Sequence, residues 1–239
     1  AIQNLSRAEW MNFIGPDPKS FMREKPNLSG FVGTENAAHK AGQYDGRQSP
    51  CILEFISSAF TEVCRDTGAA TTAARILDIG GGSGHYAKPL ADKFNTEVII
   101  VDYSREMLEQ GQYRFGQDKR LTWHQDSLPE LATFPESDDY PCLLSLACFQ
   151  FLENSKERIE SLQRAASLSS DTARFVLAHP YPSSRPGQQK LSPDLFQKDI
   201  DESGCWTLVR QAVLPYPVKD NKQALDRGCR IHAFELAKT

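Results

Sequence analysis

A chain of 239 residues, 40% of them apolar and 24% charged, is long enough for one domain with a full hydrophobic core. Its formal charge of −4 argues against a broad basic surface of the kind that binds nucleic acid. The sequence has no apolar run of about 18 residues, so it predicts no membrane span, and we expect a cytoplasmic protein. The six cysteines form no C-x-x-C pair and no zinc-type spacing, which indicates reduced thiols and no metal site.

Residues 1–50 differ in pattern from the rest of the chain. Glycines, prolines and scattered aromatic residues replace the periodic apolar spacing seen later. We therefore assign 1–50 to an N-terminal helical or loop extension and 51–239 to the main domain. The extension either covers a site as a mobile lid or lies along the surface, and the sequence leaves both open.

From residue 51 onward, helical and strand patterns alternate. Apolar residues at helical spacing predict a first helix over Cys51–Cys64. Five short apolar runs then predict strands, with helical segments between several of them. The predicted strands are Arg75–Ile79, Val98–Val101, Leu121–Trp123, Cys142–Cys148 and Arg174–Ala178. Strands that alternate with helices predict an α/β fold with a Rossmann-like, mostly parallel sheet.

Serines mark the predicted helix starts. The expected cap residues are Ser104, Ser155 and Ser192, the last of which is followed by Pro193. The final helix is predicted to end at Ser203–Gly204. Two apolar runs, Trp206–Leu214 and Arg230–Leu236, follow with no helix between them, so we expect them to pair as an antiparallel hairpin.

The run ILDIGGGSGHY, residues 76–86, joins an apolar strand to a glycine-rich loop and a helix start. Asp78 is followed by glycines at Gly80, Gly82 and Gly84. Glycines spaced in this way let the backbone turn sharply and let a ligand approach where a Cβ would clash. Since the helix start favours a negatively charged group, the pattern indicates a nucleoside-type ligand.

Two further acids end the next two predicted strands. Asp102 lies in VIIVDYS, and Asp126, followed by Ser127, lies in LTWHQDSL. Because the carboxyl ends of parallel strands line one crevice, we expect Asp78, Asp102 and Asp126 to face the same ligand. Asp102 is placed to bind a ribose diol, and Asp126 with Ser127 to meet the exocyclic amine of an adenine. Asp78 either holds the amino-acid end of a ligand or orients the loop.

The loop differs from one that binds NAD. An NAD-binding loop carries G-x-G-x-x-G directly after its strand, where it reaches a pyrophosphate. Here the pattern is D-x-G-x-G-x-G, and Asp78 would repel an anionic phosphate. The acid suits a ligand that carries an ammonium or a sulfonium group instead.

These residues resemble the class I S-adenosylmethionine-dependent methyltransferase family over roughly residues 74–238. ILDIGGGSGHY is similar to the family's glycine motif, VIIVDYS with Tyr103 to its ribose-binding strand end, and QDSL to its adenine-contact segment. The resemblance implies a seven-stranded sheet with an antiparallel last strand, S-adenosylmethionine as cofactor, and 51–239 as the methyltransferase domain. It also implies that Tyr44 and Arg47 can fold over the cofactor, and plain solvent exposure is the alternative for both.

The acceptor is inferred largely by elimination. The (N/D)-P-P-(Y/F) loop of nucleic-acid base methyltransferases and the paired glutamates of protein arginine methyltransferases are both missing. We therefore expect in-line transfer to an O, N or C atom of a small organic acceptor, as in small-molecule biosynthesis. Two alternatives remain, a protein or RNA acceptor and a degenerate fold that serves as a binding subunit. The sequence does not indicate an oligomeric state.

One histidine is a candidate for the catalytic base. His179 closes the fifth predicted strand in FVLAHPYP, and a histidine titrates in the useful pH range. The alternative is a histidine that bonds to nearby loop backbone.

Overall fold

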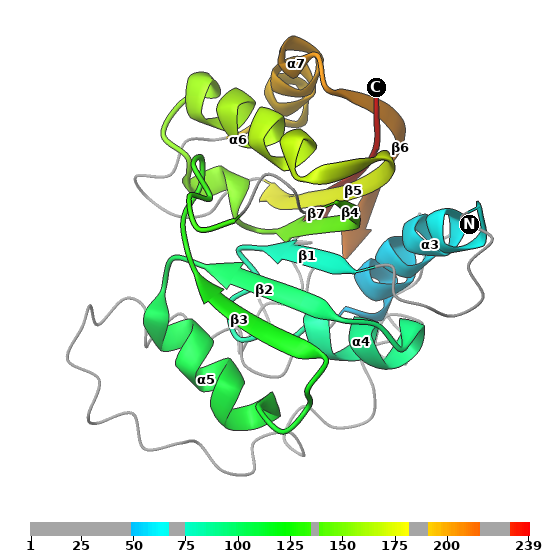
Figure 1. Cartoon of the computed structure of the whole chain (residues 1–239). Coiled ribbons are helices and arrows are strands. Elements are labelled where there is room, and N and C mark those ends of the chain that lie inside the picture. Colours follow the sequence, from blue (N-terminus) through cyan, green and yellow to red (C-terminus); the bar gives the residue numbers. More distant parts are fainter. Residues whose placement is uncertain (1–48, 67–74, 135–138, 182–190, 216–229) are drawn as a thin grey trace.

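The computed structural model describes residues 49–66, 75–134, 139–181, 191–215 and 230–239. Within these residues, seven strands form one sheet with helices on both faces (Figure 1). The strands are β1 (Ile76–Ile79), β2 (Val98–Asp102), β3 (Leu121–Gln125), β4 (Tyr140–Leu146), β5 (Ser169–Tyr181), β6 (Trp206–Pro215) and β7 (Arg230–Lys238). The helices are α3 (Pro50–Asp66), α4 (Ala87–Phe94), α5 (Arg105–Phe115), the 3-10 turn η3 (Phe149–Phe151), α6 (Ser155–Ser167) and α7 (Pro193–Ser203).

The strand order is β3-β2-β1-β4-β5-β7-β6. Strands β1 to β5 pair in parallel, whereas β7 runs antiparallel to both β5 and β6. The predicted Rossmann-like sheet and its terminal hairpin are therefore confirmed. The order reverses at β1, which has β2 on one side and β4 on the other, and ligands of open α/β sheets bind at such a reversal.

Two apolar layers hold the helices to the sheet. Ile76 and Val98 face the layer that contains α3, α4 and Leu108 of α5. The alternate residues Leu77 and Ile99 face the layer of α6 and α7. Both faces of the central strands are thus buried, as expected for parallel strands covered by crossover helices.

Helices α6 and α7 lie next to each other and are joined by a buried ion pair (Figure 1). Nε of Arg158 donates to Oδ2 of Asp199 over 2.5 Å, and both side chains are 1% exposed. Nε1 of Trp206 also donates to the carbonyl oxygen of Leu162 at 2.9 Å, which ties β6 to α6. These contacts fix α7 against the sheet.

The helix starts agree with the sequence in two of three cases. Ser104 accepts from Met107 N at 3.3 Å, and Ser192 accepts from Leu195 N at 3.1 Å, so both predicted caps are confirmed. The third prediction is wrong, because the cap of α6 is Asn154 and not Ser155. Asn154 Oδ1 accepts from Glu157 N at 3.0 Å, and the Glu157 carboxylate accepts in return from the backbone N–H of Glu153.

Several strand bounds also differ from the predicted ones. β5 begins at Ser169 rather than Arg174, because Ser169 pairs with Tyr140 at the start of β4 before the register shifts and Arg174 pairs with Cys142. β4 ends at Leu146 rather than Cys148, since Ala147 takes a left-handed φ of +53° and turns the chain into η3. In the part of the chain that the structure describes, no helix has the length and apolar character needed to cross a membrane.

Trp123 of β3 fills the space between the loop after β1 and helix α5. A Cβ added at Gly84 would lie 2.7 Å from the Trp123 ring, and one added at Gly111 would overlap the same ring. Both backbones can approach the indole only because they carry no side chain. The indole therefore sets the spacing between the glycine loop and α5.

We predict that Gly111→Ala lowers the stability of the protein. Alanine within a helix is ordinarily more stable than glycine by about 0.5–1 kcal/mol. Here the overlap with Trp123 should reverse the sign and cost about 1–3 kcal/mol. Thermal unfolding checks this result, with Gln112→Ala on the exposed side of α5 as the matched control. A Gly111→Ala protein as stable as the wild type would contradict the packing described here.

Candidate functional site

The loop between β1 and α4 turns sharply at three glycines. Gly80, Gly82 and Gly84 have φ values of +73°, +56° and +75°, a region that side chains other than glycine rarely adopt. The backbone N–H groups of Gly80 and Gly81 donate to the carbonyl oxygen of Val101 at 2.7 and 3.1 Å. The loop is therefore held against the end of β2.

The fourth glycine of the loop makes room for Asp78. A Cβ at Gly81 would lie 2.6 Å from Oδ2 of Asp78. The Asp78 side chain is 2% exposed, and within the described residues no hydrogen bond or ion pair reaches its carboxyl. Burial, and secondly the negative charge of Asp102, raise the pKa of Asp78 to about 7. The site thus contains a buried acid without a partner.

Asp102 fastens the same loop from the end of β2. Its Oδ2 accepts from Gly82 N at 2.9 Å, and its Oδ1 accepts from Ser104 N at 2.8 Å. Burial raises the pKa of Asp102, and these two hydrogen bonds oppose that rise. Each carboxylate oxygen has a second lone pair, so Asp102 can still accept hydrogen bonds from a ligand. Next to it, the Tyr103 side chain is 66% exposed.

Asp126 follows β3 and organises the next loop. Its Oδ1 accepts from Ser127 N at 2.8 Å, and its Oδ2 accepts from Thr133 N at 2.8 Å and Thr133 Oγ1 at 2.6 Å. Burial favours a higher pKa for Asp126, but these hydrogen bonds outweigh it and hold the pKa below its ordinary value. Asp126 N donates to the carbonyl oxygen of Asp102 at 3.2 Å. No residue pattern marks Thr133 as a partner of Asp126, since it lies seven residues further along the chain.

The structure brings the three predicted acids to one edge of the sheet. Asp78 pairs with Ile100 in the parallel β1–β2 register, and Asp102 pairs with Gln125 in the β2–β3 register. Asp126 directly follows Gln125. The three carboxyl groups therefore lie at neighbouring carboxyl ends of β1, β2 and β3.

Cys148 lies beside the glycine loop, a position that was not predicted from the sequence. It follows β4, and its Sγ would lie 2.5 Å from a Cβ built on Gly80. Burial first, and then the charge of Asp102, raise the pKa of the thiol to about 12, so it is neutral at physiological pH. The left-handed turn at Ala147, whose N–H donates to Ala178 O at 2.7 Å, puts Cys148 in this place. A cysteine within an apolar run carries no sequence signal for such a position.

His179 lies apart from the acids, on the α6 and α7 face of the sheet. Its side chain is 1% exposed, and its ring stacks on Phe234 with centroids 5.7 Å apart. Phe196 of α7 meets the ring edge-on at 5.1 Å, and His232 of β7 lies at 6.1 Å. Burial, followed by the charge of His232, lowers the pKa of His179 to about 4. The Leu191 backbone, which lies within reach of the ring, partly opposes this shift. Neither ring nitrogen makes a hydrogen bond of ordinary geometry within the described part of the protein.

The remaining predicted residues divide into two groups. Ser127, like Tyr103, is exposed at the strand ends. Tyr44 and Arg47 lie outside the described residues, as does nearly all of the extension 1–50. Among the described side chains, no group of three or more His, Cys, Asp or Glu residues could hold a metal ion.

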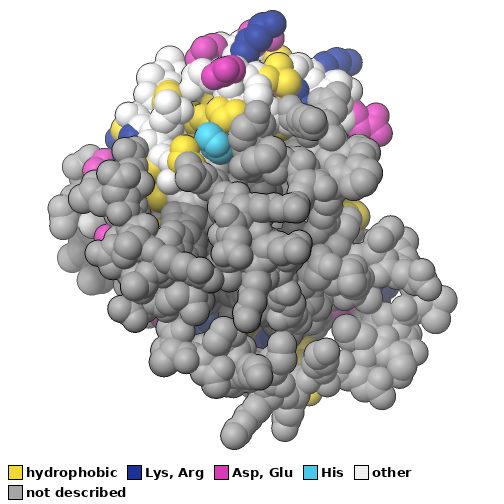
Figure 2. Space-filling view, turned by 180° about the vertical axis from the view of Figure 1, so that it is seen from behind, with side chains coloured by type: hydrophobic (Ala, Val, Ile, Leu, Met, Phe, Trp, Pro, Cys, Tyr) yellow, Lys and Arg dark blue, Asp and Glu magenta, His cyan; other side chains and the backbone are white. Residues whose placement is uncertain are grey.

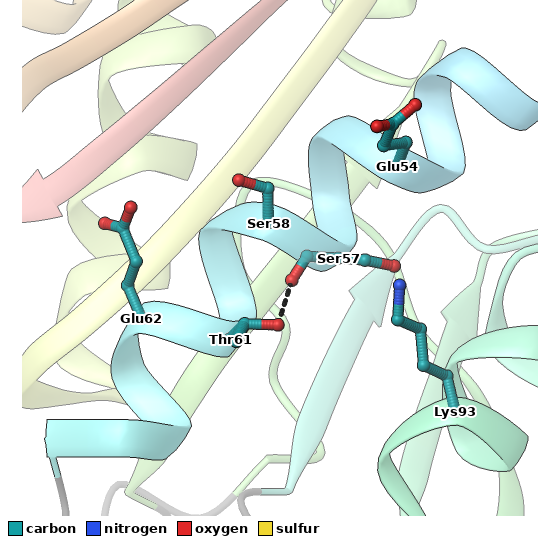
Figure 3. A pocket seen from close by; sticks show the side chains of 6 residues that line it. All are labelled: Glu54, Ser57, Ser58, Thr61, Glu62 and Lys93. Atoms are coloured by element: carbon teal, nitrogen blue, oxygen red, sulfur yellow. Dashed lines mark hydrogen bonds between the residues drawn. The ribbon is translucent and has the colours of Figure 1, made fainter.

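A separate hollow lies on the outer side of α3, next to α4 (Figure 3). Its volume is about 250 Å³. It is lined by Glu54, Ser57, Ser58, Thr61, Glu62 and Lys93. Thr61 Oγ1 donates to the Ser57 carbonyl oxygen at 2.7 Å, which is a bond within the helix. None of the strand-end acids and none of the loop glycines borders this hollow, so it is not part of the site.

Charges of both signs share the surface seen from behind (Figure 2). Lys and Arg side chains lie beside Asp and Glu side chains over the described part of that face, with no patch of one sign. The described part of this face therefore offers no broad basic footprint for nucleic acid.

Comparison with protein families agrees with this geometry. A family model described as "Methyltransferase domain" matches residues 76–169, which include the glycine loop and all three acids. A malonyl-[acyl-carrier protein] O-methyltransferase of Paenibacillus sp. (strain JDR-2) is 26% identical over 127 residues, or 52% of this chain and 46% of that protein. Its counterpart from Bacillus cereus is 23% identical over 118 residues, or 49% and 42%. The chain thus spans about half the length of the curated relatives it matches.

Solved structures show the same fold. A putative sarcosine dimethylglycine methyltransferase from Galdieria sulphuraria superposes with a TM-score of 0.62 at 14% identity, over 87% of this chain and 91% of that chain. A geranyl diphosphate methyltransferase in complex with GPP and sinefungin gives 0.59 at 11% identity, over 80% and 78%. A magnesium protoporphyrin IX methyltransferase from Synechocystis PCC 6803 with bound SAM gives 0.56 at 14% identity, over 89% and 88%.

We predict that Asp78→Asn stabilises the ligand-free protein at pH 8. The pKa of Asp78 rises on folding from an ordinary value of 3.8 to about 7, so its contribution to stability is full below about pH 4 and is lost as the pH rises to about 7. An uncharged asparagine avoids this loss, and the gain should be on the order of 2 kcal/mol. Urea unfolding at pH 8 measures it, with half-buried Glu109→Gln, which loses only a surface ion pair with Arg105, as the control expected to change little. Equal stability of wild type and Asp78→Asn at pH 8 would contradict the unpaired, buried carboxyl.

Proposed function

We propose that this chain is a class I S-adenosylmethionine-dependent methyltransferase, which binds S-adenosylmethionine and methylates a small organic acceptor. The observation that carries the proposal is the edge at which Asp78 and Asp102 pack against a loop with no room for side chains, and at which Asp126 follows the next strand. In this proposal residues 51–239 form the catalytic domain, and residues 1–50 are an N-terminal extension or lid.

The residues of this edge fit the proposed cofactor. Asp78 is a buried acid without a partner among the described residues, as suits a ligand with an ammonium and a sulfonium group. Gly80, Gly81, Gly82 and Gly84 give the loop no side chains at those positions, and Asp102 keeps free lone pairs for a ribose diol. Ser127 beside Asp126 is proposed to meet the adenine amine, and the exposed Tyr103 is proposed to contact the cofactor as well. When bound, S-adenosylmethionine supplies an electrophilic methyl group on its sulfonium sulfur.

The task of the chain is then alignment and exclusion of water. The turn at Ala147 carries Cys148 against Gly80, which closes the site on the β4 side. Tyr44 and Arg47 are proposed to cover the methionine end, where an arginine suits the carboxylate. A cytoplasmic location belongs to the same proposal and agrees with the free thiols of Cys51, Cys142, Cys148 and Cys205.

The names of similar proteins favour a small or carrier-linked acceptor. The curated relatives are named for malonyl groups on an acyl-carrier protein, and the solved structures for small amines, a prenyl diphosphate and a porphyrin. A protein or RNA acceptor, or a binding subunit without activity, has no comparable support. A carboxyl acceptor would be ionised at neutral pH and would need no base.

Any acceptor that must lose a proton needs a base, and His179 remains our candidate. Its lowered pKa of about 4 keeps the imidazole neutral at physiological pH, so a ring nitrogen is free to accept a proton. The same shift makes it a weaker base than an ordinary histidine. Its burial beneath Phe196 means that an acceptor must enter between β5 and α7 to reach it. This requirement makes the role testable.

We predict that Asp102→Ala weakens S-adenosylmethionine binding by about 1–3 kcal/mol through loss of a charged hydrogen-bonding partner. Because Asp102 also holds Gly82, a second ligand separates the two effects. A 2′,3′-dideoxy analogue of S-adenosylhomocysteine should bind the wild type more weakly than S-adenosylhomocysteine does, yet bind Asp102→Ala about as well as S-adenosylhomocysteine does. Calorimetry measures all four affinities, with Glu109→Ala on α5 as the control. If removal of the ribose hydroxyl groups weakens binding equally in the wild type and in Asp102→Ala, the assignment of Asp102 to the ribose is wrong.

We predict that His179→Phe lowers the turnover number and leaves cofactor affinity unchanged. Phenylalanine preserves the stacking on Phe234 and removes only the ring nitrogens. Single-turnover assays with a candidate acceptor measure the loss, and cofactor titration provides the control. Full activity of His179→Phe would contradict a role for His179 as the base and would leave alignment of cofactor and acceptor as the means of catalysis.

A further inference from the structure

Asp78 is a buried titratable group whose protonation the proposed methyl transfer leaves unassigned. Its side chain is 2% exposed, and no donor or cation meets it within the described residues. An unpaired charge is costly to bury, so a carboxyl in such a place takes up a proton rather than remain an anion.

Among the described residues, the groups around Asp78 offer it no positive charge. Asp102 faces it from the end of β2, and the negative charge of Asp102 opposes ionisation of Asp78. Cys148, after β4, is a neutral thiol, and the loop contributes only the backbone at Gly81. His85, at the end of the loop and before α4, is the nearest histidine in sequence.

The hydrogen bonds decide which of the two acids keeps the proton. Asp102 accepts from two backbone N–H groups, those of Gly82 and Ser104, and these bonds favour its charged form. Asp78 accepts none in the described part of the chain. Of the two acids, Asp78 is therefore the one that takes up a proton first as the pH falls.

We propose that Asp78 holds a proton in the cofactor-free protein and releases it to solvent when the cofactor binds at the glycine loop. The inference rests on the proposed function, because S-adenosylmethionine brings an ammonium and a sulfonium group to this edge. A cation within about 4–6 Å favours the carboxylate. The O–H bond of Asp78 breaks, its electron pair stays on the carboxylate, and a buffer base takes the proton.

This exchange makes cofactor affinity depend on pH. Below pH 7 Asp78 is mostly protonated in the free protein, and it must lose this proton before its carboxylate can pair with the cationic groups of the ligand. Binding therefore weakens as the pH falls. The dissociation constant should rise about fivefold from pH 7 to pH 6. The α-amino group of the ligand stays protonated over this window, because α-amino groups titrate near pH 7.7–8.0.

Isothermal titration calorimetry counts the proton directly. Titrations of the full chain at pH 6 in two buffers of different ionisation enthalpy give the number of protons released per site. We expect close to one proton for S-adenosylmethionine. We expect none for 5′-methylthioadenosine, which shares the adenosine part and lacks both cationic groups.

Two variants assign the source of the proton. Asp78→Asn should bind S-adenosylmethionine without proton release and with an affinity that is flat from pH 6 to pH 7. His85→Asn should release the same proton as the wild type. If Asp78→Asn fails to bind, the contrast between the two ligands on the wild type decides the matter.

The possible outcomes distinguish failure of this inference from failure of the proposed function. Binding of S-adenosylmethionine to the wild type without proton release would overturn the inference and leave the proposed function intact. Equal release by Asp78→Asn, or release with 5′-methylthioadenosine, would overturn it as well. No binding of either ligand at any pH would overturn the proposed function itself.

Discussion

The contact between the glycine loop and the end of β2 is the constraint on which the rest of the site depends. Gly80 and Gly81 donate to Val101, and Asp102 accepts from Gly82, so both chain segments are fixed at hydrogen-bond distance. At this spacing no side chain fits on the inner side of the loop. The sheet supplies the rigidity, since β1 and β2 are central strands buried on both faces. An arrangement of this kind presents bare backbone and carboxylate oxygens to a ligand without any further rearrangement.

The same arrangement places two acids side by side with no cation between them. Elsewhere in the described chain, buried charge is matched. Asp199 pairs with Arg158, and Glu235 lies between Arg174 and Arg210. Among the described residues Asp78 and Asp102 are the exceptions, since no cation pairs with either, and Asp78 also lacks a hydrogen bond. Unmatched acids of this kind are more typical of a binding site than of a structural core. The charge that the fold lacks is the charge that the proposed cofactor carries.

Much of the fold could be predicted from the sequence, because periodic apolar runs and cap residues act locally. The parallel sheet, the terminal hairpin and the caps at Ser104 and Ser192 follow from such local patterns. The face on which His179 lies could not be predicted, since a strand buried on both sides has no polar alternation to mark its faces. Cys148 is positioned by the left-handed turn at Ala147, and Thr133 is positioned by the loop that closes on Asp126. Neither feature can be recognised from the residue types. Tyr44 and Arg47 lie outside the described residues, so their placement over the cofactor stays a prediction.

A crystal structure with S-adenosylhomocysteine tests most directly the claim that these strand ends form the cofactor site. The account predicts both ribose hydroxyl groups within hydrogen-bond distance of the Asp102 carboxylate, and the ligand's ammonium on the Asp78 side of the glycine loop. A ligand bound elsewhere, with Asp102 still bonded only to Gly82 and Ser104, would contradict it.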